Sequence, residues 1–164
     1  MIPLKQPTEL FKQQLADMIK QQEDVSNFIQ GYNIKGLNLS RAIISKFIRI
    51  NENISNTLFI DAIIGTEGEI TSFQGCNISG SNFTRCLFKG TTWFKNTKMQ
   101  NANFHYSSVL NGHWEGADMR NCDWCGILTR FDSQHYLRSI MSEEGIQRFC
   151  GVWGYNAVLT RKEE

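Results

Sequence analysis

The chain has 164 residues, enough for one domain with a buried core. Its 17 basic and 16 acidic side chains give a net charge of +1, so overall charge favours neither nucleic acid nor a membrane surface. No apolar run is long enough to span a bilayer, and the N-terminus lacks the apolar core of a secretory signal. We expect a cytoplasmic protein of bacterial type, although secretion without a cleaved signal stays open.

Residues 1–31 are predicted to form an N-terminal helical segment. Pro7 and Thr8 suit the start of a helix. Four apolar residues follow at helical spacing: Phe11, Leu15, Met18 and Ile19. The stripe that they form either covers the segment that follows or binds a partner.

From residue 32 to about 129, a large apolar residue recurs at every fifth position, a period of neither helices nor strands. The series is weaker before residue 73, where Arg49 breaks it and residues 65–69 absorb a slip: Ile34, Leu39, Ile44, Ile54, Phe59 and Ile64. From there on it is strong: Phe73, Ile78, Phe83, Phe88, Met99, Phe104, Val109, Trp114, Met119 and Trp124. Between Phe88 and Met99 the phase shifts by one residue, with either Trp93 or Phe94 as the centre, which we interpret as a bulge.

The positions around each apolar centre are also biased. A small residue stands two places before most centres. Asn or Asp often stands directly before: Asn33, Asn38, Asn53, Asn77, Asn82, Asn103, Asp118 and Asp123. Gly or Asn, which tolerate left-handed backbone angles, stands two places after: Gly75, Gly80, Gly90, Asn101, Asn111, Gly116, Asn121 and Gly126. A chain that turns a corner every five residues forms a four-sided coil of about twenty residues per turn.

Residues one turn apart should then stack on one another. This arrangement places Phe104 between Phe83 and Trp124. It also sets Lys95 opposite Glu115 and Lys98 opposite Asp118, and such opposite charges on neighbouring strands are favourable.

The segments ANF, ADMRN, SNFTRC and CNISG resemble the pentapeptide-repeat family, whose motif is a small residue, Asn or Asp, Leu or Phe, and two polar positions. The resemblance implies an all-β fold, a right-handed quadrilateral β-helix (solenoid) over residues 32–130 with short flanking helices. The apolar centres would be stacked in its lumen. Because a solenoid end must be covered, residues 1–31 become an N-terminal helical cap.

Residues 131–164 lack the period of five and are predicted to be a C-terminal helical cap or oligomerisation segment. Related repeat proteins often dimerise through this end, so the resemblance implies a homodimer. Three large aromatics are predicted to bind a partner: Tyr106 in the corner column, and Trp153 and Tyr155 among glycines. The alternative is that Trp153 and Tyr155 cover the last coil and that Tyr106 is an ordinary surface residue.

Nothing in the sequence argues for catalysis, and we expect no catalytic, cofactor-binding or metal site. Cys122 and Cys125 have a spacing that suits zinc or redox chemistry, but Cys122 falls in the inward small column and no second pair completes a ligand set. An odd number of cysteines, five, favours reduced thiols over a disulfide framework. The three histidines lie on outward or flanking positions.

The distribution of charged residues limits the classes of partner that the sequence favours. Four basic residues lie between residues 70 and 114 with no acid, but they spread over three sides of the coil: Arg85, Lys89, Lys95 and Lys98. Some family members bind DNA gyrase as rods resembling duplex DNA, which requires an acidic surface, whereas residues 32–130 carry ten basic and seven acidic side chains. We therefore predict a non-enzymatic rigid scaffold or adaptor that binds another protein, also within a larger assembly, and no nucleic acid. The alternatives are a topoisomerase-binding DNA mimic and a secreted effector that binds a host protein.

Overall fold

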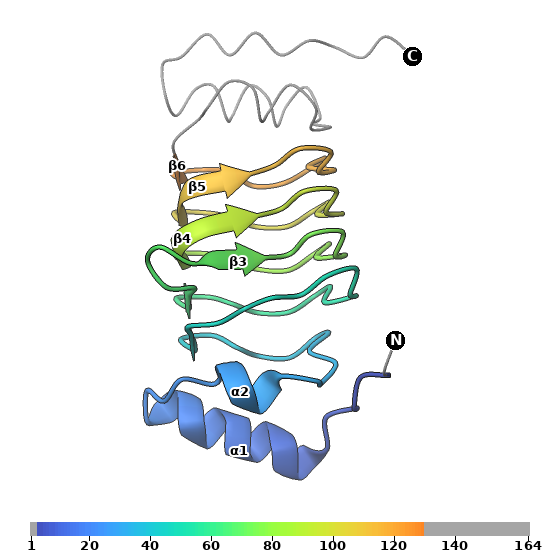
Figure 1. The fold of residues 1–164 in the computed structure, drawn as a ribbon, viewed down its shortest axis with the longest axis vertical. Coiled ribbons are helices and arrows are strands. Elements are labelled where there is room, and N and C mark those ends of the chain that lie inside the picture. The colour runs from blue at the N-terminus through green and yellow to red at the C-terminus, as the bar shows by residue number, and fades with distance from the viewer. Residues whose placement is uncertain (1–2, 130–164) are drawn as a thin grey trace, which may run out of the picture.

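The computed structural model of the chain describes residues 3–129. Its elements are two helices followed by six short strands: α1 (Glu9–Lys20), α2 (Ser26–Ile29), β1 (Ile43–Ile44), β2 (Ile63–Ile64), β3 (Ile70–Ser72), β4 (Leu87–Trp93), β5 (Ser108–His113) and β6 (Leu128–Thr129). After α2 the chain winds into a stack of coils that forms a β-solenoid (Figure 1). The predicted fold class is confirmed.

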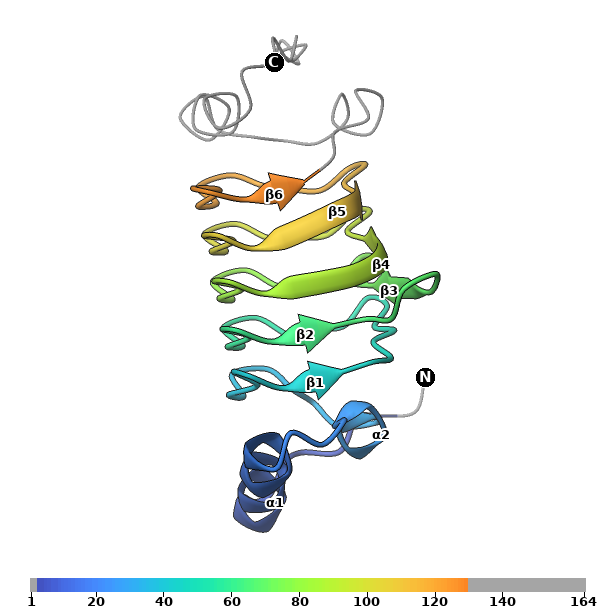
Figure 2. The same cartoon turned by 90° about the vertical axis from the view of Figure 1, so that its left-hand side faces the viewer.

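Parallel pairing joins each coil to the next, and the strands β1, β2, β4, β5 and β6 line up on one side of the stack (Figure 2). The register runs through one residue of each strand: Ile43, Ile63, Leu87, Ser108 and Leu128. These partners are 20, 24, 21 and 20 residues apart along the chain, close to the predicted coil length.

The two longer coils have identifiable causes. Residues 65–69 form a loop that projects from the stack and leads into β3, where Ile70 pairs with Thr91 of β4 (Figures 1 and 2). The second irregularity is a register shift between Phe88 and Thr91, the bulge that the sequence predicts. Because the extra residue precedes Thr91, Phe94 is fully buried while Trp93 is only half-buried.

The lumen is filled by the apolar centres. All ten strong centres are at most 3% exposed, and the six weaker ones upstream are fully buried. Phe104 lies between Phe83 and Trp124, with both ring centroids at 4.8 Å and interplanar angles of 15°. Side chains separated by one coil therefore form continuous stacks, because in-register coils place equivalent residues directly above one another.

Arg49 occupies the position of an apolar centre, but the side chain that fills the lumen in this coil is that of Phe47. The Arg49 backbone N–H donates to the Ser72 carbonyl in the usual coil-to-coil pattern. Its side chain instead turns toward α2, and the ring of Phe47 packs 4.6 Å from that of Phe73. The break in the pattern is thus local, and Phe47 restores the stack two residues earlier.

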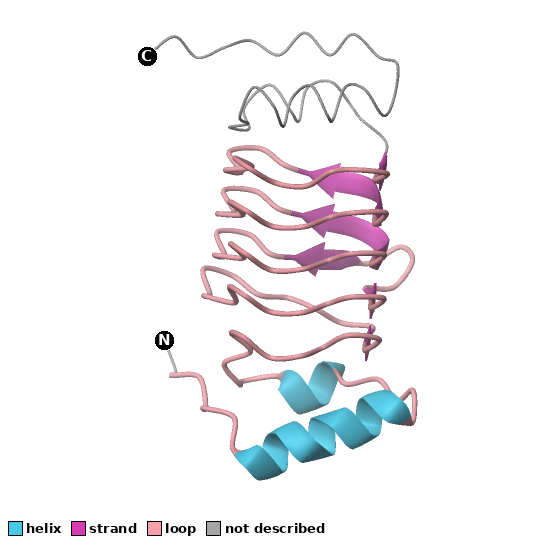
Figure 3. Cartoon of the chain, turned by 180° about the vertical axis from the view of Figure 1, so that it is seen from behind, coloured by secondary structure: helices cyan, strands magenta, loops and turns pink. Residues whose placement is uncertain are grey.

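The N-terminal helix α1 lies across the first coil (Figures 1 and 3). Thr8 caps it by accepting a hydrogen bond from the Phe11 N–H at 3.1 Å. Phe11 and Leu15 are buried, and the Phe11 ring stacks on Tyr32 at 4.1 Å. Helices within residues 3–129 are all too short or too polar to cross a bilayer. The predicted segment 131–164, with Trp153 and Tyr155, lies outside the described residues.

Candidate protein-interaction surface

Left-handed backbone angles mark the corners of the coils, as the Gly/Asn column predicts. Seven of the eight predicted corner residues have φ between +59° and +69°. The exception is Asn111, which lies within β5 and is not left-handed. The corner column therefore follows the backbone requirement rather than a preference for polar residues.

One edge of the solenoid departs from this pattern. Its first four corner residues are neither Gly nor Asn, although all are left-handed: Arg41 (φ 65°), Asp61 (59°), Arg85 (54°) and Tyr106 (54°). Gly126 completes the row at 67°. Every other left-handed residue among the coils of the described chain is Gly or Asn. We call this row the 41–126 edge.

Holding large side chains in this conformation costs free energy. For residues other than Gly, Asn and Asp, a left-handed angle costs about 1 kcal/mol or more each. Glycine at Arg41, Arg85 or Tyr106 would remove that strain. The 41–126 edge thus keeps side chains where the fold alone would favour none, which points to a role for the side chains themselves.

Two residues of the edge form a fixed ion pair. Arg85 Nε and Nη2 donate to the two carboxylate oxygens of Asp61 at 2.6 and 2.7 Å. This hydrogen bonding lowers the pKa of Asp61 below its usual value, and the charge of Arg41 adds to the effect. The Arg85 side chain is still 55% exposed, so its guanidinium is oriented and accessible at once.

Tyr106 is the most exposed aromatic residue of the described coils, at 62%. Its ring lies against the next corner, where a Cβ on Gly126 would be only 2.2 Å from Tyr106 Cδ1. The His105 ring stacks beside it at 4.3 Å. Tyr106 is therefore exposed, and its ring contacts both Gly126 and the His105 ring. Its role in partner binding stays a prediction.

The side of the solenoid next to this edge is apolar. Each coil contributes one outward aliphatic residue from the aligned strands, which face the viewer in Figure 2: Ile43, Ile63, Leu87, Leu110 and Leu128. Leu87, Leu110 and Leu128 are 38%, 37% and 50% exposed, and the two isoleucines are half-buried. We call this side the strand face.

Two other sides are polar for a structural reason. Each of the eight Asn and Asp residues that precede a centre accepts a hydrogen bond from the N–H two residues on: Asn33, Asn38, Asn53, Asn77, Asn82, Asn103, Asp118 and Asp123. These turns stabilise the following corner. On the strand face the same position carries Ile43, Ile63, Leu87 and Leu128, which the sequence analysis missed. The signal that could have revealed this face is an aliphatic residue directly before the centre about once every twenty residues.

One further ion pair of the described residues joins neighbouring coils. Lys95 Nζ lies 4.0 Å from the Glu115 carboxylate, as expected. Lys98 lies opposite Asp118 on the neighbouring coil, as expected, but Arg120 and Gln100 bind the Asp118 carboxylate at 2.6 and 2.5 Å. Of the four basic residues between residues 70 and 114, only Lys89 lies on the strand face.

The cysteine spacing does not produce a shared site. Cys122 is buried and its Sγ donates to the Met99 carbonyl at 2.8 Å, whereas Cys125 is exposed. Burial raises the pKa of Cys76 to about 11 and that of Cys122 to about 12, so both thiols are protonated at neutral pH. Within residues 3–129, no group of three or more His, Cys, Asp or Glu side chains could hold a metal ion.

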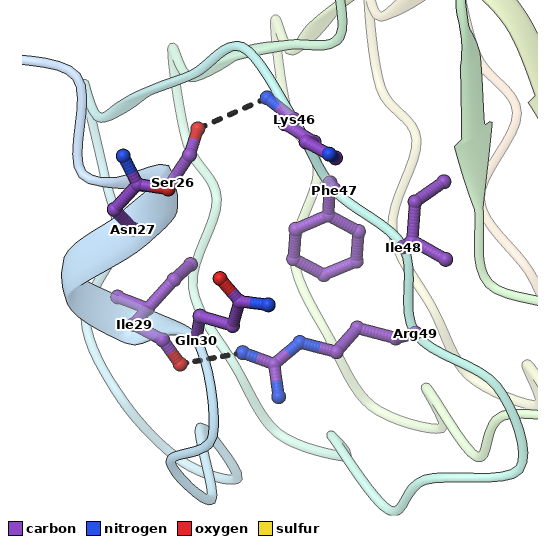
Figure 4. Close-up of a pocket in the computed structure, with 8 residues that line it drawn as sticks. All are labelled: Ser26, Asn27, Ile29, Gln30, Lys46, Phe47, Ile48 and Arg49. Carbon is purple, nitrogen blue, oxygen red and sulfur yellow. Dashed lines mark hydrogen bonds between the residues drawn. The ribbon is translucent and has the colours of Figure 1, made fainter.

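A small hollow lies where α2 meets the first coil (Figure 4). Its volume is about 60 Å³, and it lies between residues 26–30 and 46–49. That volume holds roughly two water molecules, far less than the several hundred Å³ of a typical small-molecule site. The strand face and the 41–126 edge are the stronger candidates for function.

Comparison with known proteins agrees with the repeat pattern. The family model described as pentapeptide repeats (9 copies) matches residues 73–108. No curated protein sequence matches the chain significantly.

Solved structures with a similar fold include three pentapeptide repeat proteins. HetL, involved in heterocyst differentiation regulation in the cyanobacterium Nostoc, is 14% identical, with 69% of this chain and 52% of HetL covered and a TM-score of 0.37. Rfr23 from the cyanobacterium Cyanothece is 15% identical over 66% of this chain and 63% of its own, with a TM-score of 0.25. A protein from the Arabidopsis thaliana thylakoid lumen is 14% identical over 73% and 86%, with a TM-score of 0.33.

This chain thus spans about half the length of HetL. Its matched repeats lie inside a continuous four-sided β-helix whose corners and lumen keep the same period on either side of the match. Residues 73–108 of the chain are thus similar to the pentapeptide-repeat family, and the same kind of coil continues on either side of them.

Proposed function

We propose that this protein is a rigid, non-enzymatic scaffold that binds another protein through the strand face and the 41–126 edge. One observation carries the proposal: the large left-handed corner residues of the described coils all lie on the edge that borders the aliphatic face. Strained side chains and exposed aliphatic ones thus meet on the same part of the molecule.

The chemistry of this surface suits protein recognition. Arg and Tyr are enriched among the residues that dominate binding energy, and both occur on the edge. Arg85 is oriented by Asp61, and Tyr106 rests on Gly126. Because these side chains are already ordered, binding loses little conformational entropy.

Site-specific photocrosslinking tests the proposal. A photoreactive amino acid replaces Leu87 on the strand face, or Ser79 as the matched control. Ser79 lies in the same coil on the opposite, polar side of the solenoid. In native cells we expect a discrete protein adduct from position 87 and none from position 79. The same adduct should be lost when Tyr106→Ala is added to the position-87 variant. Equal labelling from both positions, or an adduct from position 79 alone, would contradict the proposed surface.

Trp153 and Tyr155 stay separate predictions, because they lie outside the described residues. The homodimer through residues 131–164 stays a prediction for the same reason. Such a dimer would present two copies of the surface, which suits a scaffold within a larger assembly.

A further inference from the structure

We infer that the strand face receives an amphipathic α-helix of the partner protein, with acidic residues on the flank that meets the 41–126 edge. The inference rests on the proposed function and specifies the partner's chemistry. Three properties of the described surface lead to it: its dimensions, its spacing and its charge.

The aliphatic strip is long and narrow. Coils stacked at about 4.8 Å place Ile43 and Leu128 roughly 19 Å apart along the solenoid. One side of a coil has five residues, so its width is at most about 16 Å. An α-helix with its side chains is about 10–12 Å across, and thirteen residues of it cover about 19 Å. The strip therefore has the outline of a short helix.

The spacing of the strip also suits a helix. Ile43, Ile63, Leu87 and Leu128 share one register column of coils about 4.8 Å apart, in which the β5 coil has Ser108 and places Leu110 two residues further along. A helix presents an apolar group about every 5.4 Å, once per turn. Over four coils the mismatch is only about 2–3 Å. Aliphatic residues at positions i, i+4, i+7 and i+11 of the partner would thus pack between those of the strand face.

A second copy of this chain fits the strip less well. A stable dimer buries about 800 Å² on each partner. The strip offers roughly 300 Å², from the dimensions above. A helix needs less area.

Charge sets the orientation of the partner. Arg41 and Arg85 stand on the edge with Asp61 between them, and Asp61 is already bound by Arg85. Lys89 adds a cation on the strand face itself. The 41–126 edge itself carries two arginines and one aspartate, a net charge of +1 beside the aliphatic strip. Glu or Asp on the adjoining flank of a helix would meet it favourably.

An unbiased peptide selection tests the inference. Random 16-residue peptides displayed on phage are selected on the full chain and counter-selected on Leu87→Lys. We expect enriched peptides with aliphatic residues at helical spacing and with Glu or Asp along one flank. Enrichment of alternating or proline-rich sequences, of basic peptides, or of none that depends on Leu87 would overturn the inference.

The affinity of the best peptide for variants of the protein then separates the contribution of the aliphatic residues from that of the charged ones. We expect Leu87→Lys and Leu110→Lys each to weaken binding about tenfold or more, with Ser79→Lys on the polar side as the unaffected control. Arg85→Glu should weaken binding, and a peptide whose acidic flank is changed to lysine should recover it. Unchanged thermal melting of each variant establishes that the fold is intact. Failure of this charge exchange would overturn the predicted orientation.

Sedimentation of the purified chain tests whether a second copy of the chain, rather than a partner helix, covers the strand face. Loss of self-association in Leu87→Lys would assign the strand face to a second copy and overturn the helix. If the peptides fail but the photocrosslinker at position 87 still captures a protein, only the helix is wrong. If the crosslinker fails as well, the proposed function is wrong.

Discussion

Phe104 shows how single residues stabilise the solenoid. Its ring is fully buried between Phe83 and Trp124, and it contacts Trp114 edge-on at 6.0 Å. Phe104→Ala should lower the free energy of unfolding by about 3–5 kcal/mol, because the neighbouring rings cannot collapse into the cavity. Urea denaturation measures the loss.

Asn111→Ala is the matched control for Phe104→Ala. Asn111 is exposed and its backbone is not left-handed, so alanine should cost about 0.5 kcal/mol or less. Similar losses in both variants would contradict the stacked lumen.

At the residue scale, the period of five predicts most of the lumen but not its exceptions. The sequence shows that Arg49 breaks the series of apolar centres. That Phe47 fills the lumen there, while the Arg49 side chain turns away, depends on where α2 lies. The choice between Trp93 and Phe94 likewise depends on the position of the bulge. Both outcomes are set by contacts between coils, which a local pattern does not contain.

The Arg49 side chain joins α2 to the first coil. Its guanidinium donates to the Ile29 carbonyl at 2.7 Å, the Tyr32 carbonyl at 3.1 Å and the Glu52 carboxylate at 2.8 Å, and Figure 4 shows the first of these contacts. The Arg49 side chain is 7% exposed, so removing it leaves the Tyr32 carbonyl and the Glu52 carboxylate without this donor, while the Ile29 carbonyl keeps the hydrogen bond from the Tyr32 N–H.

Arg49→Met should therefore destabilise the protein by about 3 kcal/mol. Hydrogen exchange should show faster opening of α1 and α2 than of β4 and β5. The control is Arg85→Met, which removes an exposed ion pair and should cost about 1 kcal/mol or less. An equal effect of the two substitutions would argue against Arg49 as the link between helix and coil.

Individual elements differ in how far the sequence predicts them. The apolar stripe and Thr8 predict α1 correctly, because helix periodicity and capping are local properties. The strand face was missed, because its residues are about twenty positions apart and look like isolated aliphatics in any short window. The register of Lys98 opposite Asp118 was predicted correctly, but the groups that bind the Asp118 carboxylate were not. Arg120, two residues from Asp118, is a closer donor than a residue one coil away.

The charge of the whole molecule bears on the gyrase alternative. Residues 32–130 carry a net charge of +3. DNA mimicry needs a dense and regular negative surface. The protein at stoichiometric concentration should therefore neither inhibit supercoiling by purified DNA gyrase nor protect the enzyme from quinolones. Potent inhibition in a supercoiling assay would reverse this ranking of functions.

The unequal coil lengths have a consequence for how the chain reaches its native state. A stack of identical turns could pair with its neighbours one turn out of step and still bury aromatic rings in its lumen. The loop at residues 65–69 and the bulge after Phe88 make the turns 20, 24, 21 and 20 residues long. Any slipped pairing would then bury a loop or leave a strand unpaired, so misassembled stacks are less stable than the native one. The two interruptions of the repeat act as markers that distinguish one turn from the next during folding.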